Sequence, residues 1–306
     1  MKGAKIFEGV RVAGVTKELS RNREAPPRVT GVILQDGSHI KAEVVVNCAG
    51  MWARQFGEKC GVNIPNQAAE HYYLVTDAMP EVDPSWPVIE DPSSYTYIRP
   101  EGGGRLKTTL IPFNSKTEAI KTCFVLGLMV GLFEAQAAAW NVNNIPDNFS
   151  YGEIEPDWDR MGPYVEKAMK RVPACLNAGV KKFFCGPESF TPVQKNLPQI
   201  CLNFTRNFMQ DLGPVVGEAP ELSNYFVAAG LNSIGILTGG GVGRLLAHWI
   251  AHGSPDMDVT GINIDRFHKF QSNPAYRASR VVEALGMVKE KEKEVLINDD
   301  LMCFSP

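Results

Sequence analysis

The stretch YFVAAGLNSIGILTGGGVGRLLAHWIAH, residues 225–252, decides the fold that the sequence predicts. It predicts a buried strand that ends at Gly230, then a glycine-rich turn, then a helix from Val242 to His252. Glycines let the backbone approach a ligand closely, and the helix start points unpaired N–H groups and a positive dipole at the same place. This arrangement suits a phosphate, a carboxylate or the electron-rich edge of a heteroaromatic ring, with a tight structural turn as the alternative.

The rest of the chain contains both strand-like and helix-like segments. Three valines at 44–46, followed by small residues, predict a strand that is buried on both faces as in a parallel sheet. Asp36-Gly37 between two β-rich runs predicts a hairpin. Further strands are predicted at 71–76, 95–99 and 181–185, and helices at 52–60 and 157–171.

Composition excludes several classes of protein. The 306 residues are 44% hydrophobic and 21% charged, which is enough apolar material for one large domain or two smaller ones. A net charge of −3 without a basic stripe argues against a nucleic-acid partner, and no apolar run is long enough for a membrane span. The seven cysteines include no CxxC pair, and no carboxylate lies between His248 and His252, so no metal site is predicted.

Two long motifs resemble a known family. VVVNCAGMWARQFGEKCGV at 44–62 and the stretch from Tyr225 to Val259 resemble the FAD-dependent amine oxidoreductases of the glycine oxidase and D-amino-acid oxidase type. Within that superfamily they are most similar to dimethylglycine dehydrogenase, sarcosine dehydrogenase and the pyruvate dehydrogenase phosphatase regulatory subunit. Shorter matching segments are AEHYYLVTD (69–77), SYTYIRPEGGG (94–104), GPESFTP (186–192) and residues 263–286.

The resemblance implies an α/β fold of mixed helix and sheet, in two domains. An incomplete Rossmann-like FAD-binding domain is expected at 1–62 and 211–288, and an antiparallel-sheet substrate-binding domain at 63–192. The GxGxxG unit that opens the family's fold is not found, and the chain is expected to begin after it. Segments 105–126 and 193–210 and the tail 289–306 do not match the family. Lineage-specific loops and translated intron sequence are both open interpretations of these segments.

The resemblance also implies which residues contact FAD. The strand that ends in NCAGMWA is expected beside the adenosine part, and the later glycine-rich turn is expected to face the isoalloxazine ring. A helix terminus at the pyrimidine edge of that ring would stabilise the anionic reduced flavin. The expected cofactor-binding residues are Ala49, Gly50, Trp52, Asn232, Ser233, Gly235, Gly239, Gly240, Gly241 and Val242.

Four residues correspond to the family's substrate site. Arg99 is expected to bind a substrate carboxylate, because its planar fork can bind two oxygens at once, and Tyr73 is expected to contact the substrate. His71 and Tyr97 are the expected catalytic residues, which would orient the amine or accept its proton. The alternative for His71 and for the tyrosines is an ordinary strand position.

The function that the resemblance implies is the FAD-dependent oxidation of an N-methylated glycine, dimethylglycine or sarcosine, by hydride transfer to flavin. The expected partners are the small amine substrate and an electron-accepting flavoprotein, and the expected compartment is the mitochondrial matrix. Two alternatives stay open. The protein could be a non-catalytic regulator like the phosphatase regulatory subunit, or a truncated gene-model product without function.

Overall fold

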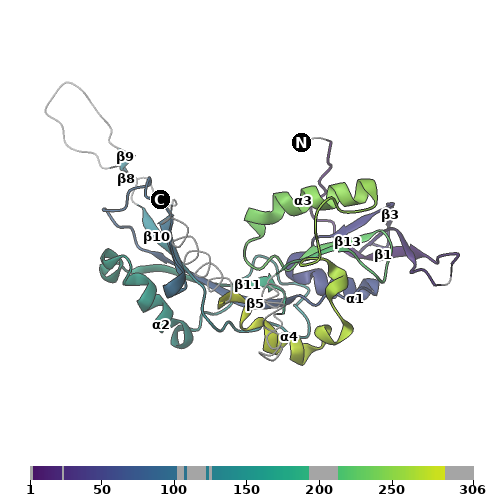
Figure 1. Ribbon diagram of the computed structural model, residues 1–306. Helices are drawn as coiled ribbons and strands as arrows, with labels where there is room; N and C mark the ends of the chain where they lie inside the picture. The colour runs from purple at the N-terminus through teal and green to yellow at the C-terminus, as the bar shows by residue number, and fades with distance from the viewer. Residues whose placement is uncertain are drawn as a thin grey trace, which may run out of the picture. The chain divides into compact units, whose positions relative to one another are not determined.

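The computed structural model describes residues 3–22, 24–101, 107–108, 122–123, 126–192 and 213–286 (Figure 1). The chain divides into two compact units. Within the described ranges, the first unit contains residues 3–69, 138–150 and 187–284, and the second contains residues 70–137, 151–186 and 285–286. Residues 63–69, 138–150 and 187–192, which the sequence analysis expected in the substrate-binding domain, thus lie in the first unit.

The first unit contains two three-stranded sheets. One is antiparallel and consists of β1 (Val12–Glu18), β2 (Arg28–Leu34) and β3 (His39–Lys41), with the predicted Asp36-Gly37 hairpin between β2 and β3. The other has the order β12 (Val215–Glu218), β13 (Tyr225–Ala229), β4 (Val45–Asn47). β13 runs parallel to β4, so the strand at 44–46 has the parallel neighbour that its sequence indicated.

Helices cover both faces of the β12-β13-β4 sheet. Leu245 and Leu246 of α3 (Gly235–His252) pack against Val216 and Phe226 on one face, where Figure 1 shows α3 alongside β13. On the other face Val227 belongs to a core shared with α1 and the β1–β3 sheet. The unit also contains α1 (Ala53–Cys60), α4 (Pro274–Val281) and 3-10 turns at Gly50–Trp52, Ile264–Arg266 and Lys269–Ser272.

Two predictions about this unit were wrong. The helix was expected to start at Val242, but α3 starts at Gly235, so the glycine-rich segment is helix rather than turn. Glycine has no side chain to contribute to apolar periodicity, and this is why the pattern in the sequence began late. The strand at 44–46 was expected to be buried on both faces, but Val46 is 39% exposed. The reason is that β4 is the edge strand of its sheet within the described residues.

The second unit is built on a largely antiparallel sheet with the order β11-β5-β10-β7-β6. Its strands are β5 (Gln67–Thr76), β6 (Ile89–Asp91), β7 (Thr96–Glu101), β10 (Gly127–Leu132) and β11 (Val180–Phe190). The first three residues of β5 and the last four of β11 belong to the first unit. The unit also contains α2 (Trp158–Met169), 3-10 turns at Pro92–Ser94 and Pro173–Asn177, and a short pair of β8 (Lys107–Thr108) with β9 (Thr122–Cys123).

One face of this sheet packs against α2. Asp157 caps the helix by accepting a hydrogen bond from the Arg160 N–H at 3.0 Å, and Met161 and Val165 point into the core. The strands predicted at 71–76, 95–99 and 181–185 and the helix at 157–171 are therefore confirmed. Most of the unmatched segment 105–126, and all of 193–210 and 289–306, lie outside the described residues. Within the described part of the chain, no helix combines the length and the apolar character that crossing a bilayer requires.

Side chains of β5 alternate between the two faces of the sheet, so substitutions at neighbouring positions should differ in their effect on stability. Leu74 is fully buried in the core against α2, whereas Val75 is half-buried on the opposite face. We expect Leu74→Ala to lower the free energy of unfolding by about 2–5 kcal/mol, since it leaves a cavity in the core. Val75→Ala should cost no more than about 1 kcal/mol. Urea unfolding monitored by circular dichroism measures both, and equal losses would contradict this assignment of the faces.

Candidate flavin site and substrate face

The chain leaves β4 through a hydrogen-bonded corner. The side chain of Asn47 donates to the carbonyl of Ala53 and to the Tyr225 hydroxyl, both at 3.0 Å, and accepts from the Ala49 N–H at 3.1 Å. Burial raises the pKa of Tyr225 well above its ordinary value, so its hydroxyl stays protonated in this corner. Gly50 has φ +56°, which explains the glycine at this turn. The corner therefore fixes the start of α1 relative to β13.

A cavity of about 680 Å³, here called cavity B, lies between the ends of β4 and β13 and the start of α3. Asn232 and Ser233 form the turn into α3 with φ values of 51° and 66°. The Oδ1 atom of Asn232 accepts from the Thr191 N–H at 2.8 Å, which fastens the turn to the end of β11. Cavity B is lined by Val46, Cys48, Gly50, Glu188, Ser189, residues 228–233, Gly235, Ile236, Gly239, Val242, Gly243, Leu246, Ala247 and Ile250.

The face of α3 toward cavity B consists of small residues. Gly235, Gly239, Gly243 and Ala247 recur every four residues, so they lie on one side of the helix, and all four line the cavity. A Cβ atom added at Gly239 or Gly243 would meet nothing within 4 Å. Packing within the chain therefore does not require these glycines, although glycine in an exposed helix costs about 1 kcal/mol relative to alanine. The space beside them belongs to cavity B, whose volume is about 680 Å³.

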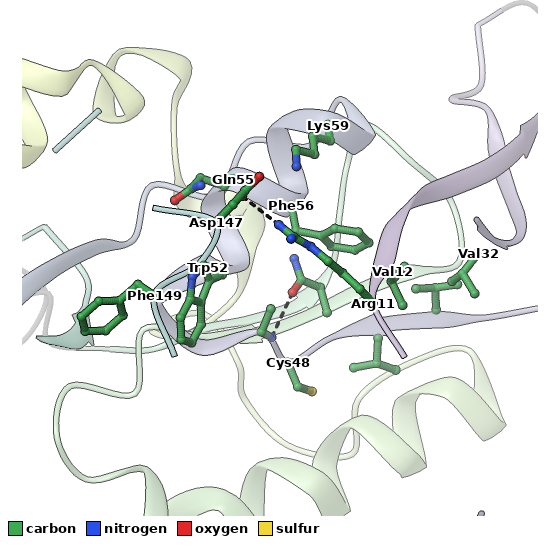
Figure 2. Close-up of a pocket in the computed structure, with 14 residues that line it drawn as sticks. Arg11, Val12, Val32, Cys48, Trp52, Gln55, Phe56, Lys59, Asp147 and Phe149 are labelled. Carbon is green, nitrogen blue, oxygen red and sulfur yellow. Dashed lines mark hydrogen bonds and ion pairs between the residues drawn. The ribbon is translucent and has the colours of Figure 1, made fainter. Parts of the chain in front are cut away.

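A second cavity of about 490 Å³, here called cavity A, lies on the α1 side of β4 (Figure 2). Trp52 and Phe56 supply aromatic walls, and Arg11, Lys59 and Asp147 supply its charges. Arg11 and Asp147 form an ion pair of 2.8 Å. Val46 and Cys48 line both cavities, so the end of β4 separates them. The lining of cavity A is Arg11, Val12, Val32, Val45, Val46, Asn47, Cys48, Ala49, Trp52, Gln55, Phe56, Lys59, Asp147 and Phe149.

The structure brings eight of the ten expected cofactor residues to these cavities. Ala49 and Trp52 line cavity A, and six line cavity B: Gly50, Asn232, Ser233, Gly235, Gly239 and Val242. Gly240 and Gly241 line neither cavity, because they lie on another side of α3. Sequence reasoning missed Arg11, Lys59 and Asp147, for which no motif gave a signal. It also missed Gly243, although the four-residue spacing of small residues would have indicated it.

The four expected substrate residues lie on one face of the second unit's sheet. Strand β10 pairs with both β5 and β7, and its Gly131 lies opposite Tyr73 on one side and Tyr97 on the other. A Cβ at Gly131 would overlap the Tyr97 ring, so the glycine makes room for that ring. His71 and Arg99 lie two residues from these tyrosines along their strands and therefore share the same face.

Contacts on this face connect three of these residues. The His71 and Tyr97 rings both contact Phe133, with centroids 4.9 and 6.0 Å away. Tyr97 Oη and Arg99 Nη2 approach the sulfur of Met129 at 3.7 and 3.2 Å. Tyr73 stacks on Phe184 instead, with centroids 4.5 Å apart. Arg99 also forms an ion pair of 3.0 Å with Glu101, so its guanidinium already has a carboxylate partner.

A charged network lies next to His71. Arg160 forms ion pairs with Glu70 and with the fully buried Glu134, the latter at 3.0 Å, and donates to the Tyr72 hydroxyl at 3.1 Å. Burial raises the pKa of Glu134, and the guanidinium of Arg160 acts in the opposite direction. Burial likewise raises the pKa of Tyr72. The network therefore places two carboxyl groups, both paired with Arg160, close to His71.

Comparison with known families identifies the class. The FAD dependent oxidoreductase family matches residues 1–249, and the FAD dependent oxidoreductase central domain matches residues 252–289. The chain therefore belongs to the FAD-dependent oxidoreductases, as the motifs in its sequence indicated, and FAD is the cofactor of this family.

Several known proteins are similar to this chain. Human sarcosine dehydrogenase, a mitochondrial protein, is 34% identical over 87% of the chain and 24% of its own length. The 4-methylaminobutanoate oxidase (formaldehyde-forming) of Paenarthrobacter nicotinovorans is 33% identical over 93% of the chain and 28% of its own length. The mitochondrial pyruvate dehydrogenase phosphatase regulatory subunit of Mus musculus is 28% identical over 85% of the chain and 25% of its own length. The chain thus spans about a quarter of the length of these relatives.

A solved structure supports the fold. The L-proline dehydrogenase of P. horikoshii superposes with a TM-score of 0.56 at 20% identity, covering 87% of this chain and 55% of that chain. The mixed helix-and-sheet fold is thus that of the D-amino-acid-oxidase type, which confirms the expected fold class.

The buried turn at Asn232 predicts an order of stability among variants. Asn232→Gly removes the hydrogen bond to Thr191 and should lower the free energy of unfolding by about 1–3 kcal/mol. Asn232→Ala removes the same bond but keeps a Cβ at positive φ, where alanine is about 1 kcal/mol less favourable than glycine, so this variant should be less stable than Asn232→Gly by about that amount. Urea unfolding compares the two variants, and an alanine variant at least as stable as the glycine variant would contradict the left-handed turn.

Proposed function

We propose that this chain holds FAD, with the adenosine part in cavity A and the isoalloxazine ring in cavity B, and that the protein oxidises an N-methylated amino acid. The observation that carries the proposal is the face of α3 formed by Gly235, Gly239 and Gly243. Open space borders this face at Gly239 and Gly243, and the end of β4 lies beside it. A flat ring could lie directly on the helix backbone only where side chains are missing.

The lining residues of cavity A and cavity B fit the adenosine end and the isoalloxazine end of FAD, respectively. Cavity B carries one charged lining residue, Glu188, and is otherwise mostly apolar, as a ring system requires. The first turn of α3 directs its N–H groups and positive dipole toward the cavity, which would stabilise negative charge on a bound ring. Cavity A combines aromatic walls with Arg11 and Lys59, which suits a base and its phosphates. FAD, when bound, supplies the acceptor for a hydride from the carbon next to the amine nitrogen.

The proposed substrate class rests on the relatives and on the sheet face of the second unit. Sarcosine and 4-methylaminobutanoate are both N-methylated amino acids with a carboxylate. Arg99 would bind that carboxylate. To do so, its guanidinium would either contact Glu101 and the substrate together or give up Glu101 for the substrate. His71 and Tyr97 are close enough to Phe133 to frame a small amine, and either could orient the amine or accept its proton.

The finer assignments follow the relatives. We infer a mitochondrial location, because sarcosine dehydrogenase and the phosphatase regulatory subunit are both mitochondrial. We also infer that an electron-accepting flavoprotein reoxidises the cofactor.

A regulatory role without catalysis is the second candidate, supported by the likeness to the phosphatase regulatory subunit. Bleaching of the bound flavin by sarcosine or dimethylglycine under anaerobic conditions would favour the enzyme. Capture of a phosphatase without any spectral change would favour the regulator.

Two glycines of α3 provide a matched test of the cofactor site. Gly239→Leu would fill the space beside cavity B and should weaken FAD binding about tenfold or more, since overpacking costs about 1–3 kcal/mol. Gly241→Leu places the same side chain on a part of the helix that lines neither cavity, so it should bind FAD like the wild type. Calorimetric titration with FAD measures both affinities. Equal affinities in the two variants would contradict the proposed position of the ring.

Arg99 provides a test of the substrate class. In the FAD-loaded protein, Arg99→Gln should raise KM for sarcosine by about tenfold to a hundredfold, since it removes a charge-assisted bidentate contact. Arg99→Lys should fall between that variant and the wild type. Oxidation of an N-methylamine that has no carboxylate is the control and should be nearly unchanged. An equal loss with both substrates would show that Arg99 supports the sheet rather than the carboxylate.

A further inference from the structure

The Arg11–Asp147 ion pair lies directly at cavity A. Figure 2 shows the Arg11 side chain extended from the start of β1 toward Asp147, with Phe56 and Lys59 nearby. The two side chains are 46% and 69% exposed. An ion pair this exposed contributes little to folding stability, so stability alone does not account for its position.

Asp147 is presented from a segment that is fixed in place. Residues 138–150 have no regular secondary structure, but Gln55 of α1 holds them through two hydrogen bonds with the backbone of Ile145, at 3.1 and 2.7 Å. The buried Arg54 donates to the Asn143 carbonyl at 2.7 Å. The carboxylate of Asp147 therefore stays near cavity A, where it lies within reach of Arg11.

The other charges at the cavity favour an anion. Arg11 and Lys59 are both cationic, and Asp147 is the one carboxylate among the lining residues. Without Asp147 the lining would carry two unopposed positive charges next to the Trp52 and Phe56 rings. A phosphate would bind an arginine fork at least as strongly as a carboxylate does, because it offers more oxygens and more charge.

We propose that Asp147 is an internal competitor for Arg11: when the phosphate-bearing half of FAD enters cavity A, Arg11 exchanges the carboxylate of Asp147 for a phosphate oxygen. This inference rests on the proposed function. It adds that the affinity for FAD is limited by the ion pair that must open. A flavin without phosphates gains nothing from Arg11 and leaves the pair closed, so Asp147 affects phosphate-bearing ligands alone.

The test is a double-mutant cycle on the 306-residue chain, with FAD and riboflavin as probes in calorimetric titrations. Asp147→Asn should tighten FAD binding about two- to fivefold, the range expected for an exposed ion pair. Arg11→Gln should weaken FAD binding about tenfold. The double variant should match Arg11→Gln, because Asp147 acts only through Arg11. Riboflavin should bind all four proteins equally.

Arg21→Gln and Asp265→Asn are the charge-matched controls, since both residues lie in the first unit and line neither cavity. They should bind FAD like the wild type. An Asp147→Asn variant with unchanged or weaker FAD affinity overturns the inference, as does the same tightening in the Arg11→Gln background or an equal effect on riboflavin. In these cases the wild type still binds FAD and the proposed function stands. A wild-type chain that binds neither FAD nor riboflavin overturns both this inference and the proposed function.

Discussion

The parallel pairing of β4 with β13 is the constraint on which both cavities depend. It aligns Val45 with Tyr225 and Asn47 with Val227, and the side-chain hydrogen bond between Asn47 and Tyr225 joins residues 178 positions apart. Two neighbouring parallel strands end at the same edge of a sheet, so the segments that follow them lie together. The corner after Asn47 and the turn before α3 thereby become walls of one region. The pairing holds the end of β4, which lines both cavities, beside β13, whose end lines cavity B.

The start of α3 shows where sequence patterns stop being informative. Apolar periodicity needs side chains, and the segment from Gly239 to Gly243 supplies only Val242, so the pattern could not reveal that the helix had already begun at Gly235. A different pattern was present: small residues recur every four positions from Gly235 to Ala247, which predicts a bare helix face. Eight of the ten cofactor residues that the family motifs indicated still line the two cavities. The glycines and Asn232 form a recognisable cluster in the sequence even when their secondary structure is assigned wrongly.

The sheet of the second unit was more predictable, for a physical reason. Side chains alternate between the faces of a strand, so the sequence of β5 already separates buried Leu74 from the half-buried side where His71 and Tyr73 lie. The register between strands was not predictable, because β10 lies between β5 and β7 and follows them in the chain after a segment without pattern. In the first unit, the contact of Gln55 with the aperiodic residues 138–150 likewise leaves no periodic signal in the sequence.

The two cavities also differ in where their electrostatic field originates. At cavity B the positive potential comes from the backbone of α3, whose dipole no side-chain substitution removes, and Glu188 is the one charged lining residue. At cavity A the field comes from Arg11, Lys59 and Asp147, whose partners can exchange. A ligand that extends over both cavities would therefore meet the helix dipole at its ring and side-chain charges that can exchange partners at its phosphates. Recognition of the ring would depend on shape, and recognition of the phosphates on charge and on the salt concentration.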